Sequence, residues 1–317
     1  MEGAMSKFQP IMFSDFEIDT DIIDVLNTLI KMEKINILLI GDIGSGKTSL
    51  LNSLIREYYK DIPPKCYADN VLHINSIKDQ GINYYRNDVK IFCQTGSLVK
   101  HKKKIIVLDN IDFINEQSQQ VFRNCIDKFS HNVHFISSCG NIQKVVESLQ
   151  SRFVIIKLKQ VSHENMTRIL YKIKETLNIS ITNDAEQFIL NVSRNSVKTL
   201  VNYMEKIKLL GENVDLVIAN KLCTNISFLI FEEYSGFVKN KNLRSAIIVI
   251  YDIYDKGYSV MDILDNYFLF VKITNIFSEL EKYNIIHYIC KYITVFHNIH
   301  EDEIELSLFT NNLVSLF

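Results

Sequence analysis

The stretch that decides the fold of this chain is an apolar segment that runs directly into a glycine-rich loop: INILLI at residues 35–40, then GDIGSGKT at residues 41–48. The loop fits the pattern G-x-x-x-x-G-K-S/T at every fixed position, and a helical pattern of apolar residues follows it from Leu50 to Tyr58. The glycines of such a loop let backbone N–H groups close around phosphate oxygens, and the N-terminus of the next helix adds partial positive charge. The sequence therefore predicts a P-loop for the phosphates of a nucleoside triphosphate, and we expect ATP.

Two residues of the loop have roles that follow from their chemistry. Lys47 would contact the β- and γ-phosphates, and the hydroxyl of Thr48 would bind Mg²⁺. The residues expected to hold the nucleotide are Gly41, Asp42, Ile43, Gly44, Ser45, Gly46, Lys47, Thr48 and Ser49.

A second apolar run, Lys104–Leu108, ends in a carboxylate, Asp109. At the end of a strand beside the loop, Asp109 would hold Mg²⁺ through water. The next residue is Asn110, where hydrolysing enzymes of this kind have a Glu that polarises the attacking water. An amide cannot act as a general base, so the sequence predicts nucleotide binding and leaves hydrolysis open. Asp112, two residues after Asn110, could point toward the site, but we favour its interpretation as a surface or helix-capping residue.

Five short runs rich in Ile, Val and Leu occur in the first 160 residues, with helical patterns between them. They are Ile35–Ile40, Val71–Asn75, Lys104–Leu108, Val133–Ser138 and Val154–Leu158. None alternates cleanly between apolar and polar residues, as expected for strands buried on both faces. This alternation of strand and helix predicts an α/β fold with a parallel five-stranded sheet and helices on both faces.

The strand pattern stops after residue 159, and the rest of the chain is helical in pattern. We therefore predict three domains: a nucleotide-binding α/β domain at 1–159, a helical lid at 160–222 and an all-helical domain at 223–317. The chain carries a formal net charge of -2, so any contact with nucleic acid needs a local basic face. The six cysteines match no zinc-ligand spacing. The longest apolar runs are too short to span a bilayer, and no membrane partner is expected.

Several stretches outside the loop share the motifs of one family. Pro10–Phe16 is similar to P-x-x-F-x-D-I, Gly81–Arg86 to part of R-G-I-D-V-V-R, and Leu108–Asp112 stands where L-D-E-A-D belongs. Gln119–Arg123 is similar to Q-Q-A-L-R, and Glu147–Phe153 to E-P-I-Q-S-R-C. The chain thus resembles the small subunits of replication factor C, the AAA+ clamp loaders of eukaryotes, archaea and some large DNA viruses, over nearly its whole length.

The resemblance implies a role in DNA replication with ATP and Mg²⁺ as cofactors. It implies assembly with other clamp-loader subunits as a hetero-pentamer, acting on a sliding clamp and primer–template DNA. It makes residues 223–317 an oligomerisation collar. It implies a nuclear location, or a cytoplasmic replication site if the source is a virus, to which the Asn-, Ile- and Lys-rich composition points.

The resemblance also assigns roles to single residues. Arg152 stands at the position of an arginine finger, which acts on the nucleotide of a neighbouring subunit. Lys198 stands where the sensor arginine of G-D-x-R belongs, and it can contact a γ-phosphate only as a point charge. Gly140 replaces the sensor asparagine, and Asn141 lies one residue late. These differences, like Asn110, weaken the case for fast hydrolysis at this subunit's own site.

Three basic residues are candidates for contact with the DNA backbone: Arg86, Lys90 and Arg123. Arg86 and Lys90 are four residues apart, so they would share one helix face. A solvated basic face explains them equally well. The run Lys100–Lys104 is interpreted as a solvated loop.

Two other functions stay open. An origin initiator or helicase loader would share the AAA+ fold, but it would carry a basic winged-helix domain that the tail does not suggest. An architectural clamp-loader subunit with a vestigial nucleotide site would fit the same motifs without ATP binding.

Overall fold

The computed structural model describes residues 8–76, 81–211, 213–224, 226–296 and 300–317. By its internal contacts the chain divides into two compact units. Unit 1 comprises Met1–Thr176 and Asn195–Asn202, and unit 2 comprises Leu177–Arg194 and Tyr203–Phe317. The predicted domain boundaries after residues 159 and 222 stay a prediction.

Unit 1 is built on a parallel five-stranded sheet with the strand order β2-β3-β4-β1-β5. The strands are β1 Ile37–Ile40, β2 Val71–Asn75, β3 Lys104–Asp109, β4 Val133–Cys139 and β5 Val154–Lys157. The predicted parallel five-stranded sheet is therefore confirmed, and each strand lies within one or two residues of its predicted range. Continuous runs of Ile, Val and Leu form these strands because helices cover both faces of the sheet.

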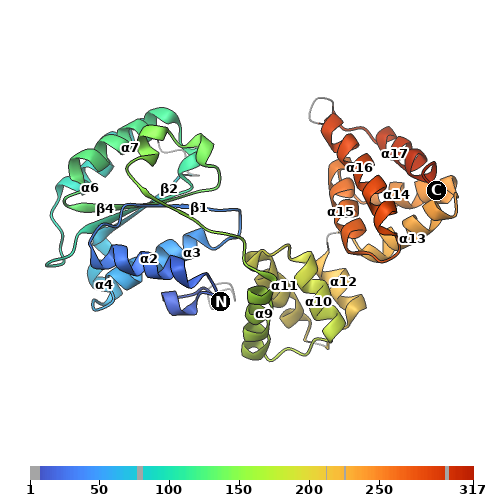
Figure 1. The fold of residues 1–317 in the computed structure, drawn as a ribbon, viewed down its shortest axis with the longest axis horizontal. Coiled ribbons are helices and arrows are strands. Elements are labelled where there is room, and N and C mark those ends of the chain that lie inside the picture. The colour runs from blue at the N-terminus through green and yellow to red at the C-terminus, as the bar shows by residue number, and fades with distance from the viewer. Residues whose placement is uncertain (1–7, 77–80, 212, 225, 297–299) are drawn as a thin grey trace. The chain divides into compact units, whose positions relative to one another are not determined.

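Successive side chains along β1 and β3 enter two different cores, and β4 contributes to both. Leu38, Ile106 and Phe135 pack on one face with the helices after β2 and β3, whereas Ile37 and Ile105 pack on the other face with the helix after β1. Figure 1 shows α2, α3 and α4 on one side of the sheet and α6 and α7 on the other. The helical elements of unit 1 are η1 Phe13–Asp15, α2 Thr20–Lys31, α3 Lys47–Tyr58, α4 Pro64–Tyr67, η2 Ala68–Asn70, α5 Ile82–Arg86, α6 Asp88–Gln94, η3 Ile111–Phe113, α7 Glu116–Phe129, η4 Ile142–Lys144, α8 Glu147–Gln150, α9 His163–Leu177 and the start of α11 Val197–Leu210.

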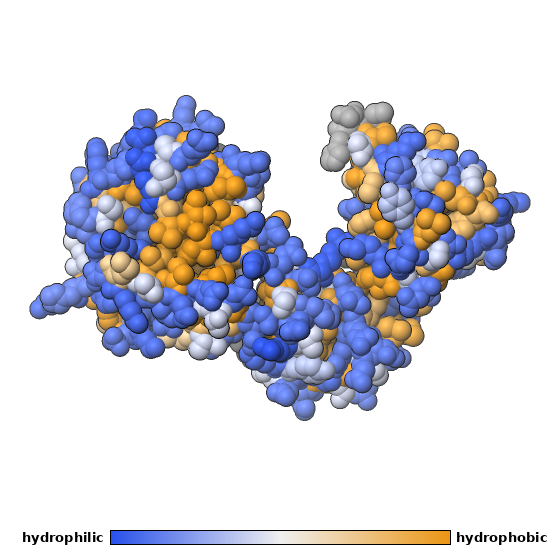
Figure 2. Space-filling view, in the orientation of Figure 1, coloured by the Kyte–Doolittle hydropathy of each residue, from blue (hydrophilic) through white to orange (hydrophobic). Residues whose placement is uncertain are grey.

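Strand β5 departs from the prediction of burial on both faces. Val154 and Ile155 are 41% and 45% exposed. The reason is position, because β5 is an edge strand that pairs only with β1. Figure 2 shows further apolar side chains gathered on the face of unit 1 turned toward the viewer.

Unit 2 is helical in its described residues, apart from one isolated bridge between Ile181 and Val214. An aromatic core that includes Phe231, Tyr267 and Phe309 holds its C-terminal helices together. Its elements are α10 Asn183–Val192, the end of α11, α12 Leu216–Cys223, α13 Phe228–Lys239, α14 Leu243–Tyr254, α15 Val260–Ile273, α16 Glu279–Phe296 and α17 Ile304–Val314. Within the part of the chain that the structure describes, no helix has the length and apolar character needed to cross a membrane.

Candidate nucleotide site

The glycine-rich loop links the carboxyl end of β1 to the N-terminus of α3. Gly44 and Gly46 have φ values of +82° and +87°, a backbone region that glycine adopts without steric cost. A Cβ atom added to Gly41 would lie 2.7 Å from Ser45 Oγ and 3.1 Å from Leu158 O. The three glycines of the motif are therefore required by backbone conformation or by close packing.

Lys47 is the first residue of α3, and its side chain lies inside the loop. The ammonium group donates hydrogen bonds to the carbonyl oxygens of Gly41 and Asp42, each at 2.8 Å. Burial lowers the pKa of Lys47, while the carboxylates of Asp109 and Asp112 act in the opposite direction. Phosphate oxygens could take over from these carbonyls as partners, and their negative charge would favour the protonated amine.

Ser45 provides an independent sign that the loop fits an anion. Its side chain is 7% exposed, and its buried Oγ has no hydrogen-bond partner among the described residues. Buried hydroxyls in native proteins are nearly always hydrogen-bonded. A phosphate oxygen held by the loop would supply the missing partner.

A pair of oxygen ligands suited to Mg²⁺ stands next to the loop. Thr48 Oγ1 donates a hydrogen bond to Asp109 Oδ2 at 2.8 Å, which joins the start of α3 to the end of β3. Ser138 Oγ, from β4, donates to the other carboxylate oxygen of Asp109. Hydroxyl and carboxylate oxygens are the ligands that Mg²⁺ prefers, with phosphates and water completing the shell. The donor set therefore fits the predicted ion.

Asn110 begins a sharp turn at the end of β3. Its φ is +57°, a conformation that Asn adopts more readily than most residues, and its N–H donates to Ser138 Oγ at 3.0 Å. Asp112 Oδ2 accepts hydrogen bonds from the N–H groups of Gly140 and Asn141 at 3.1 and 3.0 Å. Asp112 thus caps the turn after β4, in agreement with its interpretation as a capping residue.

The two predicted sensor positions are Gly140 with Asn141, after β4, and Lys198, at the start of α11. Asn141 Oδ1 accepts from the N–H of Gln143 at 2.9 Å, so the asparagine caps η4. Ser196, at the N-terminus of α11, lies so close to the P-loop that a Cβ on Gly44 would be 2.6 Å from Ser196 Oγ. Lys198 is exposed in the first turn of that helix. Asn195, with φ of +57°, stands where the family pattern has glycine.

A pocket of about 550 Å³ opens beside the loop, at the carboxyl ends of β1, β4 and β5. Asp42 lines it, and its Oδ2 accepts a hydrogen bond from Gln160 Nε2 at 2.8 Å. The remaining lining residues include Gly140, Asn141 and Lys157. Both the loop and the sensor position after β4 therefore border the same hollow, as expected where parallel strands end at a topological switch point.

The candidate DNA contacts lie on helices on the other face of the sheet from α3. Arg86 ends α5 and Lys90 lies in α6, so they belong to two short helices that meet at Asn87. That these two residues share one face stays a prediction, because Asn87 between the two helices keeps a helical backbone conformation. Arg123 lies on α7 and forms an ion pair with Asp127 at 3.7 Å.

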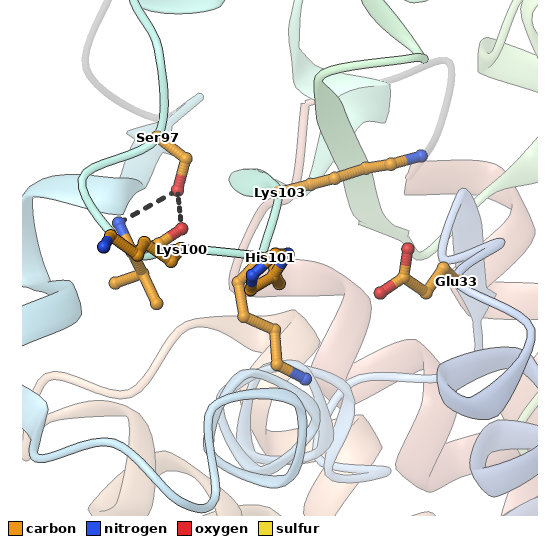
Figure 3. Close-up of a pocket in the computed structure, with 7 residues that line it drawn as sticks. Glu33, Ser97, Lys100, His101 and Lys103 are labelled. Atoms are coloured by element: carbon orange, nitrogen blue, oxygen red, sulfur yellow. Dashed lines mark hydrogen bonds between the residues drawn. The ribbon is translucent and has the colours of Figure 1, made fainter.

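The basic run before β3 is only partly solvated. Lys104 is 5% exposed, and its ammonium group donates to Thr95 Oγ1 at 2.6 Å and to Phe92 O at 3.3 Å. The expectation of a solvated loop is wrong for this residue. Figure 3 shows the rest of the run, with Glu33 facing the loop that carries His101 and Lys103. This loop lies at the amino end of β3, opposite the carboxyl ends that carry the nucleotide site.

Three residues that contact predicted site residues were not themselves predicted from the sequence: Ser138, Ser196 and Asp127. Ser138 holds Asp109, Ser196 contacts the P-loop, and Asp127 pairs with Arg152. Ser138 and Asp127 lie outside the motifs compared above. Ser196 lies within the stretch compared with G-D-x-R, but its approach to Gly44, 152 residues away along the chain, is not part of that pattern.

The strand order, the P-loop after β1 and the carboxylate after β3 define a P-loop domain of the AAA class. Residues 37–161 match the AAA family, described as the ATPase family associated with various cellular activities, and this part of the chain is an AAA domain.

The relatives of the whole chain are more specific. It is 28% identical to replication factor C subunit 4 of Saccharomyces cerevisiae, with 84% of this chain and 82% of the relative covered. It is 24% identical to a replication factor C small subunit of Acanthamoeba polyphaga mimivirus, with 87% and 85% covered. Homologues of this chain are therefore replication factor C small subunits, as the sequence motifs predicted.

Solved structures show the same fold in more distant proteins. RuvB of Thermotoga maritima aligns with a TM-score of 0.52 at 12% identity, covering 77% of this chain and 85% of RuvB. Domain III of the replication initiation protein DnaA from the same organism aligns with a TM-score of 0.53 at 19% identity, covering 67% and 95%. At these low identities the two alignments show that the fold is shared.

Proposed function

We propose that this chain is an ATP-binding subunit of a clamp-loader complex that opens a DNA sliding clamp and places it on primer–template DNA during replication. The observation that carries the proposal is the P-loop arrangement, with Lys47 inside the loop, the unpartnered Ser45 hydroxyl and the Thr48–Asp109 pair. The similarity of this chain to replication factor C subunit 4 over 84% of its length supports the clamp-loader role. The complex would act where DNA is replicated, in the nucleus or at a viral replication site.

The chain's own residues suit binding better than hydrolysis. Lys47, Ser45 and the loop N–H groups would hold the phosphates, while Thr48 and Asp109 would hold Mg²⁺, which neutralises charge on the β- and γ-phosphates. Asn110 supplies no base where a Glu would polarise water. In this proposal ATP sets the geometry between subunits, and turnover at this site is slow. Arg152 would act on a neighbouring subunit's nucleotide, and Lys198 would contact the γ-phosphate.

Nucleotide binding by the full-length chain is the first test. We expect a fluorescent ATP analogue to bind in the presence of Mg²⁺, and Lys47→Ala to weaken binding at least tenfold, because a charge-assisted contact to phosphate is lost. Lys60→Ala, an exposed residue just after α3, is the matched control and should bind like the wild type. A folded wild-type chain without measurable ATP affinity would instead support the architectural subunit.

The complex is tested by its composition and turnover. A tag on this chain should recover other clamp-loader subunits and a sliding clamp, identified by mass spectrometry. Recovery of a replicative helicase without a clamp would favour the helicase-loader alternative. In the recovered complex, Asn110→Glu should raise DNA-stimulated ATP turnover if Asn110 limits hydrolysis, and Lys47→Ala should lower turnover only by the share that this site contributes.

A further inference from the structure

Arg152 is held against α7 by a dense set of contacts. Its Nε and Nη2 donate to the two carboxylate oxygens of Asp127 at 2.5 and 3.0 Å, a bidentate pair. Its Nη1 donates to Ser148 O and, at 3.2 Å, to Ser151 Oγ. All three guanidinium nitrogens are therefore engaged within this chain.

This arrangement conflicts with action on another subunit. A guanidinium recognises phosphate through the same planar edge that it presents to a carboxylate. While Nε and Nη2 face Asp127, that edge cannot also face a γ-phosphate. The contacts to Asp127 must therefore break before Arg152 can act in trans.

We propose that Asp127 is a positioning residue. It keeps Arg152 bound within its own chain until the nucleotide of a neighbouring subunit competes for the guanidinium and the contact with Asp127 breaks. This inference rests on the proposed function, because it requires a neighbour with bound triphosphate. It adds a regulatory step to that function: the finger is available only when a stronger anion competes with Asp127.

The ion pair between Arg152 and Asp127 is weak enough to form and break reversibly. The side chains of Arg152 and Asp127 are 30% and 40% exposed, so solvent screens their attraction. Ion pairs this exposed to solvent add little to stability, so the pair can form and break readily. A triphosphate carries several negative charges and can outcompete a single screened carboxylate.

Arg123 makes the release easier. It lies one turn before Asp127 on α7, with its Nε 3.7 Å from Asp127 Oδ2. That Nε is buried and forms no hydrogen bond within the described residues. When Arg152 leaves, Arg123 can approach Asp127, so the carboxylate keeps a cationic partner. Arg123 and Arg152 therefore compete for one anion.

Protection of Arg152 by Asp127 can be measured on the isolated full-length chain. Phenylglyoxal modifies arginine side chains, and mass spectrometry gives the rate at which Arg152 reacts. We expect Arg152 in Asp127→Asn to react about two- to fivefold faster than in the wild type, because the charged partner is gone. Glu116→Gln removes an exposed carboxylate from the first turn of the same helix and is the matched control, expected to leave the rate unchanged. An unchanged rate in folded Asp127→Asn would overturn the proposal.

A second variant covers the case in which Asp127→Asn does not fold. Arg123→Gln removes the competing cation and should slow the modification of Arg152, since Asp127 then pairs with Arg152 alone. A faster reaction in this variant would contradict the competition.

The effect on turnover separates a positioning role from a purely structural one. In the complex recovered with this chain, Asp127→Asn should raise ATP turnover measured without DNA, whereas Arg152→Ala should lower turnover. A stabilising ion pair alone would produce no increase. Asp127→Asn should bind ATP like the wild type, since its own P-loop is intact. Lack of ATP binding would therefore contradict the proposed function, while unchanged reactivity of Arg152 would contradict this inference alone.

Discussion

Single residues with positive φ angles set the course of the backbone around the nucleotide site. Gly44 is in the left-handed region, and Asn110 and Asn195 share it with φ values of +57°. Asparagine tolerates this region better than most residues, so Asn195 can replace the glycine of the family pattern and still bring Ser196 to the P-loop. The same tolerance lets Asn110 turn the chain after Asp109 while it removes the usual base.

Gly44→Ala should weaken ATP binding about fivefold or more. Alanine at a φ of +82° costs about 1–2 kcal/mol, and its Cβ would lie 2.6 Å from Ser196 Oγ, which also accepts a hydrogen bond from Thr199 Oγ1. Titration with a fluorescent ATP analogue measures the effect. In Gly44→Ala with Ser196→Ala, the combined loss of affinity should be smaller than the sum of the two single losses. Strict additivity would show that the two residues do not interact.

At the scale of elements, the junction of β4 with the end of α3 buries a histidine. His134 is 2% exposed, and its ring meets that of Tyr58 edge to face at 5.2 Å. Burial, with the nearby charges of Lys103 and Lys102 acting in the same direction, lowers the pKa of His134 to about 3. The folded strand therefore carries a neutral imidazole at neutral pH.

This histidine should make the protein less stable in mild acid. Well above pH 6.5 the imidazole is neutral in both the folded and the unfolded state and contributes no pH dependence. Below pH 6.5 the unfolded chain gains a proton that the folded chain does not accept, so stability falls until the pH reaches the folded pKa. Between pH 7.5 and pH 5, the loss from this residue should be about 2 kcal/mol. Urea unfolding at both pH values should show a smaller loss in His134→Phe, which keeps a ring beside Tyr58. Equal losses would assign the acid sensitivity to other groups.

At the scale of the whole molecule, the nucleotide site draws on segments that are distant in sequence. Unit 1 contains the P-loop together with residues Asn195–Asn202, although the segment between, Leu177–Arg194, belongs to unit 2. A nucleotide that contacts both the P-loop and the start of α11 would therefore bind within unit 1, although residues of unit 2 separate its two contact segments in the sequence.

ATP with Mg²⁺ should raise the melting temperature of the full-length chain and slow hydrogen exchange in two separate segments, residues 41–48 and 195–202. A ligand at 100 times its dissociation constant stabilises the state that binds it by about 2.7 kcal/mol. Lys47→Ala should show neither effect. Protection confined to residues 41–48 would mean that Ser196 and Lys198 do not sense the nucleotide.

The sequence by itself determined the parallel sheet, the P-loop and the Asp109 carboxylate. These features follow from local patterns: apolar runs of strand length, glycines where the backbone must turn, and a charge at a strand end. The tertiary structure alone decided that Val154 and Ile155 are exposed on an edge strand, that Lys104 is buried, and that Arg86 and Lys90 lie on two separate short helices. It also decided that Ser138 holds Asp109, that Ser196 meets Gly44, and that Asp127 holds Arg152. Such contacts join residues from 25 to 152 positions apart, as the hydrogen bond between Arg152 and Asp127 and the approach of Ser196 to Gly44 show. No local pattern encodes them, because they depend on which strands and helices the fold brings side by side.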